Sequence, residues 1–178
     1  MRAHADEREA YAAIKRALAR QFPYDIESYC RGKEEFVQER QAKALEQICL
    51  DWDRLYIAAR LVQRERVISA LVQAGSVAAA LLTESGNIYT GVCIDTACSL
   101  GMCAERSAIA AMITGGEHRA KKLLAVTPGG NAVMPCGACR EALMQLGADA
   151  GSTEILCEYE TKTAVRLSSL VPQWWSPM

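Results

Sequence analysis

The sequence lacks both a strong excess of charge and a long apolar run. Among 178 residues, Lys and Arg number 20 and Asp and Glu number 21, which gives a net charge of −1. Nucleic-acid-binding domains are usually strongly basic, and this chain has no basic stripe with interleaved aromatics, so we expect no polynucleotide partner. No apolar run reaches the roughly 18 residues that span a bilayer, and residues 1–12 carry no apolar segment of the secretory kind. These absences predict a soluble, cytoplasmic protein without a membrane partner.

The amino-acid composition of the chain is that of a folded domain. Hydrophobic residues make up 51% of the chain and charged residues 23%, which excludes a disordered protein. The length allows one ordinary domain with a helical extension, and a domain of this size needs no disulfides to be stable.

Residues 1–54 have the pattern of helices. Apolar residues at helical spacing from Tyr11 to Leu18 predict a short helix that ends before Pro23. Gly32 is expected to separate it from a longer helix, because apolar residues from Leu45 to Val62 recur at three- and four-residue steps. Nothing in this region has catalytic spacing. We expect a helical extension that covers the main domain, or one that makes contacts between subunits.

Residues 55–178 have the pattern of an α/β domain. Short apolar runs and turn residues predict strands at 77–82, 88–94, 123–127, 154–159 and 163–167, and helical composition predicts helices at 103–113 and 136–146. The order is β-β-α-β-α-β-β. This order predicts an α/β fold with helices packed on a sheet of about five strands.

The eight cysteines fall into two groups. Five have no ligand-like spacing and are expected to be small buried hydrophobes: Cys30, Cys49, Cys93, Cys98 and Cys157. The other three lie in two short motifs, Cys103-Ala-Glu-Arg and Pro-Cys136-Gly-Ala-Cys139-Arg. In an intracellular chain, cysteines at such spacing indicate metal ligands before disulfides.

Both motifs stand where a helix is expected to begin. The unpaired N–H groups and the dipole of a first helical turn favour thiolate over thiol. Cys136 and Cys139 share one helical face, and the second helix start adds Cys103 as a third sulfur. Three protein ligands with one open position are typical of a catalytic zinc, so we expect one Zn²⁺ per chain.

Charged residues beside the ligands have expected roles of their own. Glu105 lies too far round the helix to be a fourth ligand, and we expect it to point into the pocket as a general acid and base. Three thiolates leave a zinc site with a net charge of −1, which a cation would offset. Arg106 and Arg140 follow the two motifs directly and are candidates to hydrogen-bond the sulfurs.

These two motifs resemble those of the zinc deaminases, in which a Cys-x-Glu segment is combined with Pro-Cys-x-x-Cys. Their all-cysteine form is similar to that of the small cytidine deaminases and of the related blasticidin-S deaminases. The resemblance extends over the hairpin that begins at Val77 and over the ending Leu-Val-Pro at 170–172. It implies a three-layer domain with a mixed sheet, small-molecule hydrolytic deamination with release of ammonia, and a homo-oligomer, either a tetramer or a dimer.

The resemblance also suggests which residues contact the substrate. It implies that Trp175 stacks on the base, across a subunit boundary in some arrangements, and that Ala104 lines the pocket. Cytidine deaminases usually carry Asn-x-Glu to bind the ribose, where this chain has Cys93 and Asp95. The resemblance as a whole implies cytidine, deoxycytidine or a cytosine nucleoside analogue as the substrate.

Two alternatives stay open at this point. One is a deaminase of another amino-heterocycle, such as a blasticidin-type antibiotic, because the ribose-binding positions are altered. The other is a zinc-stabilised interaction protein without catalysis, which would have no use for Glu105 beside an open metal position.

Overall fold

The computed structural model describes residues 5–176, which separate into two compact units that divide between Ile48 and Cys49. The helices are α1 (Ala5–Gln21), α2 (Ile26–Val62), α3 (Ala104–Thr114), α4 (Gly137–Met144) and α5 (Leu167–Leu170), with a short 3₁₀ helix at Ala150–Ser152. The strands are β1 (Arg66–Ser69), β2 (Val72–Thr83), β3 (Ile88–Thr96), β4 (Ala120–Val126), β5 (Ala132–Val133), β6 (Glu154–Glu158) and β7 (Thr163–Arg166). Among the described helices, none combines the length and apolar character that a membrane crossing requires.

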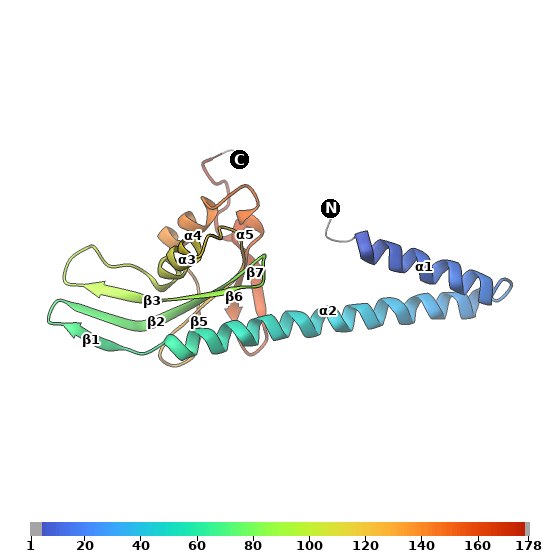
Figure 1. The fold of residues 1–178 in the computed structure, drawn as a ribbon, viewed down its shortest axis with the longest axis horizontal. Coiled ribbons are helices and arrows are strands. Elements are labelled where there is room, and N and C mark those ends of the chain that lie inside the picture. The colour runs from blue at the N-terminus through green and yellow to red at the C-terminus, as the bar shows by residue number, and fades with distance from the viewer. Residues whose placement is uncertain (1–4, 177–178) are drawn as a thin grey trace. The chain divides into compact units, whose positions relative to one another are not determined.

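The first unit contains α1 and the beginning of α2 (Figure 1). The carboxylate of Asp25 accepts a hydrogen bond from the N–H of Ser28 at 3.0 Å and so caps the start of α2. The predicted break at Gly32 is wrong, since α2 runs through this residue. A Cβ atom there would lie 2.6 Å from a methyl group of Leu18. Gly32 therefore permits close packing of α1 on α2 instead of ending a helix.

The second unit is built on one mixed sheet. Its strands follow the order β1-β2-β4-β6-β7, with β3 also paired to β2 and β5 also paired to β4. The pairs are antiparallel except β4 with β6, which is parallel. The sheet has seven strands where the sequence predicted about five. The two missed strands, β1 and β5, are four and two residues long and carry little periodicity.

Two cores on opposite faces of this sheet give the unit three layers. Alternate residues of the central strands point to each face, so Leu81 and Leu123 pack with α3 and α4, whereas Leu82 and Leu124 pack with the end of α2. In Figure 1 the sheet separates α3 and α4 from that part of α2. The predicted three-layer α/β class is confirmed. The predicted boundary after residue 54 falls inside α2.

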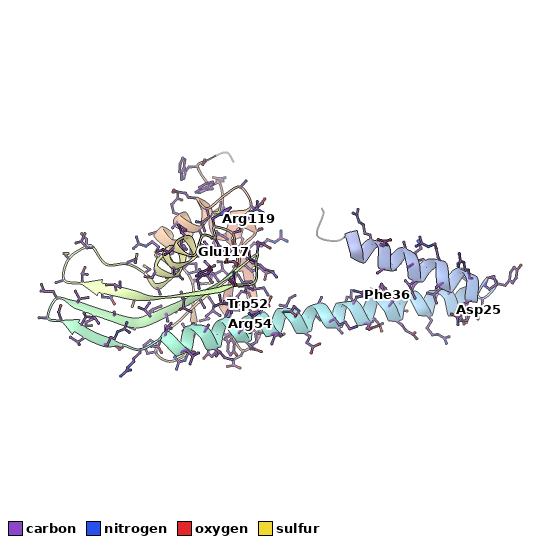
Figure 2. The ribbon with its side chains drawn as sticks, in the orientation of Figure 1. Asp25, Phe36, Trp52, Arg54, Glu117 and Arg119 are labelled. Carbon is purple, nitrogen blue, oxygen red and sulfur yellow. The ribbon has the colours of Figure 1, made fainter. Side chains whose placement is uncertain are left out.

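A buried charged group fixes α2 on β4. Trp52, labelled in Figure 2, lies on α2 and is 1% exposed. The ammonium of Lys122 lies 4.9 Å from the centre of the Trp52 ring. The same ammonium lies 3.3 Å from a carboxylate oxygen of Asp51. Because a buried ammonium needs compensation by nearby negative charge, this arrangement favours one position of the helix along the strand.

The expectation that five cysteines are buried is wrong for three of them. Cys30, Cys49 and Cys98 are exposed, Cys157 is half-buried and Cys93 is buried. The first two lie on exposed faces of α2 and the third lies in the loop after β3. Apolar character alone therefore does not place a cysteine in the core.

Candidate metal centre and its pocket

The three motif cysteines meet at the starts of α3 and α4. Cys103 and Cys136 are the N-cap residues of these two helices, and both have extended backbone angles. Cys139 lies one turn further along α4. The sulfur of Cys136 is 3.6 Å from that of Cys103 and 3.5 Å from that of Cys139, and all three sulfurs lie within 4.8 Å of one another.

Close packing of α3 on β3 fixes the position of Cys103. A Cβ atom at Gly91 would lie 2.3 Å from the backbone nitrogen of Ala108 and 2.6 Å from the backbone oxygen of Ala104. The hydroxyl of Ser107 donates to the carbonyl of Val92 at 2.9 Å. Gly91 and the hydroxyl of Ser107 therefore determine how closely α3, with Cys103 at its start, approaches β3.

The three sulfurs fit a zinc ion. Tetrahedral coordination with Zn–S bonds of about 2.3 Å requires sulfurs roughly 3.8 Å apart, close to the two distances given above. Burial, together with the charge of Glu105, raises the pKa of the Cys139 thiol. Burial and the neighbouring Cys136 also raise the pKa of Cys103. Crowded thiols of this kind ionise together when a cation lies between them, and metal binding then releases their protons.

Backbone donors favour one thiolate in particular. Burial alone would raise the pKa of Cys136, but hydrogen bonds from the N–H groups of Cys139 and Ala138 lower it overall. These N–H groups belong to the first turn of α4, where they have no partner within the helix. The helix start thus provides part of the stabilisation that a metal-binding thiolate needs.

The two arginines bond to the backbone of the metal-binding segments. Arg106 donates to the carbonyl of Gly101 at 3.3 Å. Arg140 donates to the carbonyl of Pro135 at 2.8 Å and to that of Leu170 at 3.3 Å. Their predicted hydrogen bonds to the sulfurs stay a prediction, while these contacts hold the loops before each motif.

A pocket of about 320 Å³ opens beside the sulfurs. Glu105 lines it and is only 5% exposed, and Ala104 lines it as well and is fully buried. The remaining lining residues come from β2, β3, β5 and the segments that directly precede α3 and α4: Ser76, Val77, Cys93, Asp95, Gly101, Met102, Cys103, Val133, Met134 and Cys136. Glu105 thus lines the same pocket as two of the candidate metal ligands, Cys103 and Cys136.

One end of this pocket is polar. The sulfur of Cys93 lies 3.0 Å from the hydroxyl of Ser76, and it accepts a hydrogen bond from the N–H of Val77 at 3.3 Å. It also lies 3.4 Å from a carboxylate oxygen of Asp95, toward which its S–H is directed. Cys93 is buried and Asp95 is exposed. The two residues that differ from the usual ribose-binding pair therefore lie together in the pocket.

Trp175 lies outside the pocket of its own chain. Its ring is 73% exposed, and its indole N–H donates to Glu141 at 2.9 Å. The neighbouring Trp174 donates to the same carboxylate group at 2.9 Å. The predicted stacking of Trp175 on a base stays a prediction and would require a second subunit.

Sequence reasoning missed several pocket residues. Ser76, Met102, Val133 and Met134 carry no chemical motif. Only their positions gave a signal, since Met102 directly precedes Cys103 and Met134 stands two residues before Cys136.

The family model described as the cytidine and deoxycytidylate deaminase zinc-binding region matches residues 51–153. The chain belongs to this deaminase family. The match includes Cys103, Glu105, Cys136 and Cys139, so this deaminase has the zinc as its cofactor. A second family model, GrpB protein, matches residues 1–43, which lie in the first unit.

Similar proteins of the deaminase family come from several bacteria. A cytidine deaminase of Mycobacterium tuberculosis is 32% identical over 98 residues, which cover 54% of this chain and 70% of that protein. A cytidine deaminase of Sporosarcina psychrophila is 41% identical over 70 residues, or 39% of this chain and 52% of that protein. The crystal structure of the Mycobacterium leprae cytidine deaminase is 30% identical with a TM-score of 0.57, and the match covers 68% of this chain and 98% of that one.

Proposed function

We propose that this chain catalyses the hydrolytic deamination of cytidine or deoxycytidine to the uracil nucleoside, with release of ammonia. The observation that carries the proposal is the shared pocket, which buried Glu105 lines together with Cys103 and Cys136, the two cysteines whose sulfurs cluster with that of Cys139. A small-molecule aminohydrolase needs this combination of an acid–base group and a metal site with an open position.

Each part of the site has a separate task in this reaction. The three thiolates hold the zinc, which when bound supplies a Lewis acid that makes water a nucleophile at neutral pH. Glu105 takes a proton from the attacking water and gives it to the ring nitrogen beside the amino-bearing carbon. It then takes the remaining proton of the added hydroxyl and passes it to the amino group, which leaves as ammonia while the carbonyl of the product forms. Water is consumed and one ammonia is released, so atoms and protons balance.

The apolar lining of the pocket supports the choice of a base as the reacting group. Val77, Met102 and Val133 offer surfaces against which a flat ring packs without losing hydrogen bonds. Asp95 lies at the exposed end, where its second carboxylate oxygen is available to a sugar hydroxyl. A blasticidin-type substrate stays the alternative, because Cys93 provides no amide of the kind that usually binds ribose.

The test is ammonia release from cytidine, deoxycytidine, cytosine and blasticidin S by the zinc-loaded protein, with Glu105→Gln alongside. We expect turnover of a nucleoside that falls by about 10²–10⁴ or more in the variant, since this is the typical contribution of a general acid or base. Zinc content should stay at one ion per chain. Near-normal turnover in Glu105→Gln would overturn the assigned role of this residue.

The assembly and the location belong to the same proposal. We infer a homo-oligomer, a tetramer or a dimer, because Trp175 is exposed and would meet a pocket only in a second copy. Light scattering on the purified zinc-loaded protein tests this state, and a monomer that is fully active would contradict it. A cytoplasmic location stays a prediction from the sequence.

A further inference from the structure

Two backbone segments that line the pocket are held from outside it by the same pair of side chains. The first segment is Ser76–Val77 of β2, and the second is Val133–Met134 at the end of β5. The pair is Arg60, in the last turn of α2, and Gln63, directly after it. Neither side chain lines the pocket itself.

Gln63 bonds to the backbone at a break in the regular pairing of β2. The register between β2 and β3 shifts between Ala74 and Ala78, and Gly75 there has a φ of +84°. Carbonyl groups at such a bulge lose their partners in the sheet. The amide nitrogen of Gln63 lies 3.2 Å from the carbonyl oxygen of Ser76 and 3.5 Å from that of Gly75. It thereby fixes the direction in which Ser76 and Val77 enter the pocket.

Arg60 bonds to the loop that leads from β4 to β5. One guanidinium nitrogen lies 3.2 Å from the carbonyl oxygens of both Thr127 and Pro128. The hydroxyl of Tyr56, one turn earlier in α2, donates to the carbonyl of Gly130 at 3.1 Å. This loop continues directly into Val133 and Met134, so its position determines where these side chains lie.

A direct hydrogen bond joins the two holding residues. The guanidinium of Arg60 donates to the side-chain oxygen of Gln63 at 2.8 Å. This oxygen and the amide nitrogen that reaches Ser76 belong to one rigid amide plane. The chain of contacts therefore runs without interruption from the Thr127–Pro128 carbonyls through Arg60 and Gln63 to the Ser76 carbonyl.

We propose that Arg60 and Gln63 form a positioning pair that fixes the two pocket-lining segments relative to each other and thereby sets substrate affinity. The kinetic part of this inference rests on the proposed deaminase function. Since the pair touches neither the sulfurs nor Glu105, its loss changes how well the substrate is held and leaves the proton transfers intact.

The first experiment separates KM from kcat for cytidine or deoxycytidine, whichever the wild type turns over. Gln63→Glu keeps the side-chain oxygen that accepts the hydrogen bond from Arg60. It replaces the amide nitrogen, which donates to the carbonyls of Gly75 and Ser76, by an oxygen that repels them. We expect KM to rise about tenfold with kcat within about twofold, the pattern of lost ground-state binding. Gln63→Ala should act in the same direction. An unchanged KM in both variants would overturn the proposal.

Arg64→Ala is the matched control. Arg64 directly follows Gln63 and is exposed, and its side chain makes no hydrogen bond within residues 5–176. Its substitution should leave KM and kcat at the wild-type values. A rise in KM equal to that of Gln63→Ala would mean that any change in this segment has the same effect, and it would remove the specific role of the pair.

A double-mutant cycle tests whether the two residues act as one bridge. If they do, Arg60→Ala combined with Gln63→Ala raises KM no more than the larger single change, because either substitution alone breaks the chain. Effects on KM that multiply would show two independent contacts and would contradict the pair.

The reactivity of Cys93 toward an alkylating reagent tests the positioning role without any measurement of deaminase activity. Alkylation of the zinc-loaded protein by iodoacetamide is followed at peptide level for Cys93 and for exposed Cys98. We expect Gln63→Ala to accelerate labelling of Cys93 several-fold, since it releases the segment that covers this sulfur, while Cys98 labelling stays constant. Equal Cys93 rates in wild type and variant would overturn the positioning role even if no nucleoside is a substrate.

Discussion

The two units of this chain differ in how their helices are held. Among the side chains described in the first unit, Leu18 is the buried hydrophobic one, at 7% exposure. The second unit has cores on both faces of a seven-stranded sheet, with many side chains fully buried. Burial of apolar surface is the main source of folding free energy. The comparison therefore assigns most of the stability to the deaminase domain.

Local contacts predominate in the first unit. The ammonium of Lys33 lies 4.6 Å from the ring centre of Tyr29, and Lys43 pairs with Glu39 at 2.7 Å. Both pairs are four residues apart on one helix, and each such pair contributes only about 0.2–0.5 kcal/mol to a helix. If the two units are stabilised separately, substitutions in one should leave the other unchanged, and the largest effects should come from the second unit.

Loss of a metal ligand should have the largest effect and should be confined to the second unit. Cys136→Ala removes a thiolate that joins α3 and α4, so zinc content and deaminase activity should be lost and stability should fall by several kcal/mol. Metal analysis together with hydrogen exchange resolved by residue checks this. Full zinc occupancy in the variant would mean that another residue is the ligand.

Truncation of the largest buried side chain comes next. Trp52→Ala removes the largest side chain through which α2 packs on the sheet and should cost about 3–5 kcal/mol, measured by urea unfolding. Trp175→Ala, which changes an indole that is 73% exposed, serves as the control and should cost less than about 1 kcal/mol. Equal losses in the two variants would contradict the three-layer packing described above.

The buried residue of the first unit should matter only locally. Leu18→Ala removes the side chain that packs against Gly32, so exchange protection of α1 should fall while kcat/KM stays within about twofold. Hydrogen exchange and steady-state kinetics provide the two measurements. A parallel loss of activity would show that the two units are energetically coupled.

The smallest effect concerns pH. Hydrogen bonds from Thr83, Asn87 and Tyr89 lower the pKa of Glu117 from 4.5 to about 2. A lowered pKa stabilises the folded state above pH 4.5, and this contribution is lost as the pH falls toward 2. Wild type should therefore lose more stability over this range than Glu117→Gln does, as acid titration of unfolding would measure.

Glu39→Gln is the matched control for that titration. The pKa of Glu39 is also lowered, but by hydrogen bonding to Lys43 within the same helix. Its substitution should change the acid unfolding of the second unit little. An identical effect of the two substitutions would mean that the turn around Glu117 adds no stability of its own.

The parts of the fold that the sequence predicted were those with strong local signals. Cys-x-Glu and Pro-Cys-x-x-Cys mark two helix starts, and the structure places Cys103 and Cys136 as their N-caps. The apolar run from Val77 to Leu82 predicted a strand, because β2 is buried on both faces there. At these positions the residue types of the motif and the spacing of the apolar residues predict the same element.

The parts that were missed depend on contacts between distant segments. Gly32 has the composition of a helix break, and only the approach of Leu18 explains a glycine inside α2. Arg60 and Gln63 have the composition of ordinary polar residues at a helix end, whereas Arg60 bonds to the carbonyl of Thr127, 67 residues away, and Gln63 to that of Ser76, 13 residues away. Spacing cannot reveal a residue whose role is to bond to a remote carbonyl.

Gly91 has a consequence for anyone who wishes to redesign this enzyme. Since a Cβ atom there would meet α3 at 2.3 Å, even alanine would lift the helix that carries Cys103 and Glu105. A mutant library restricted to pocket-lining positions would leave Gly91 out. This residue nevertheless determines the distance of both Cys103 and Glu105 from β3. Changes at Gly91 would alter the reaction centre without altering a single group that the substrate meets.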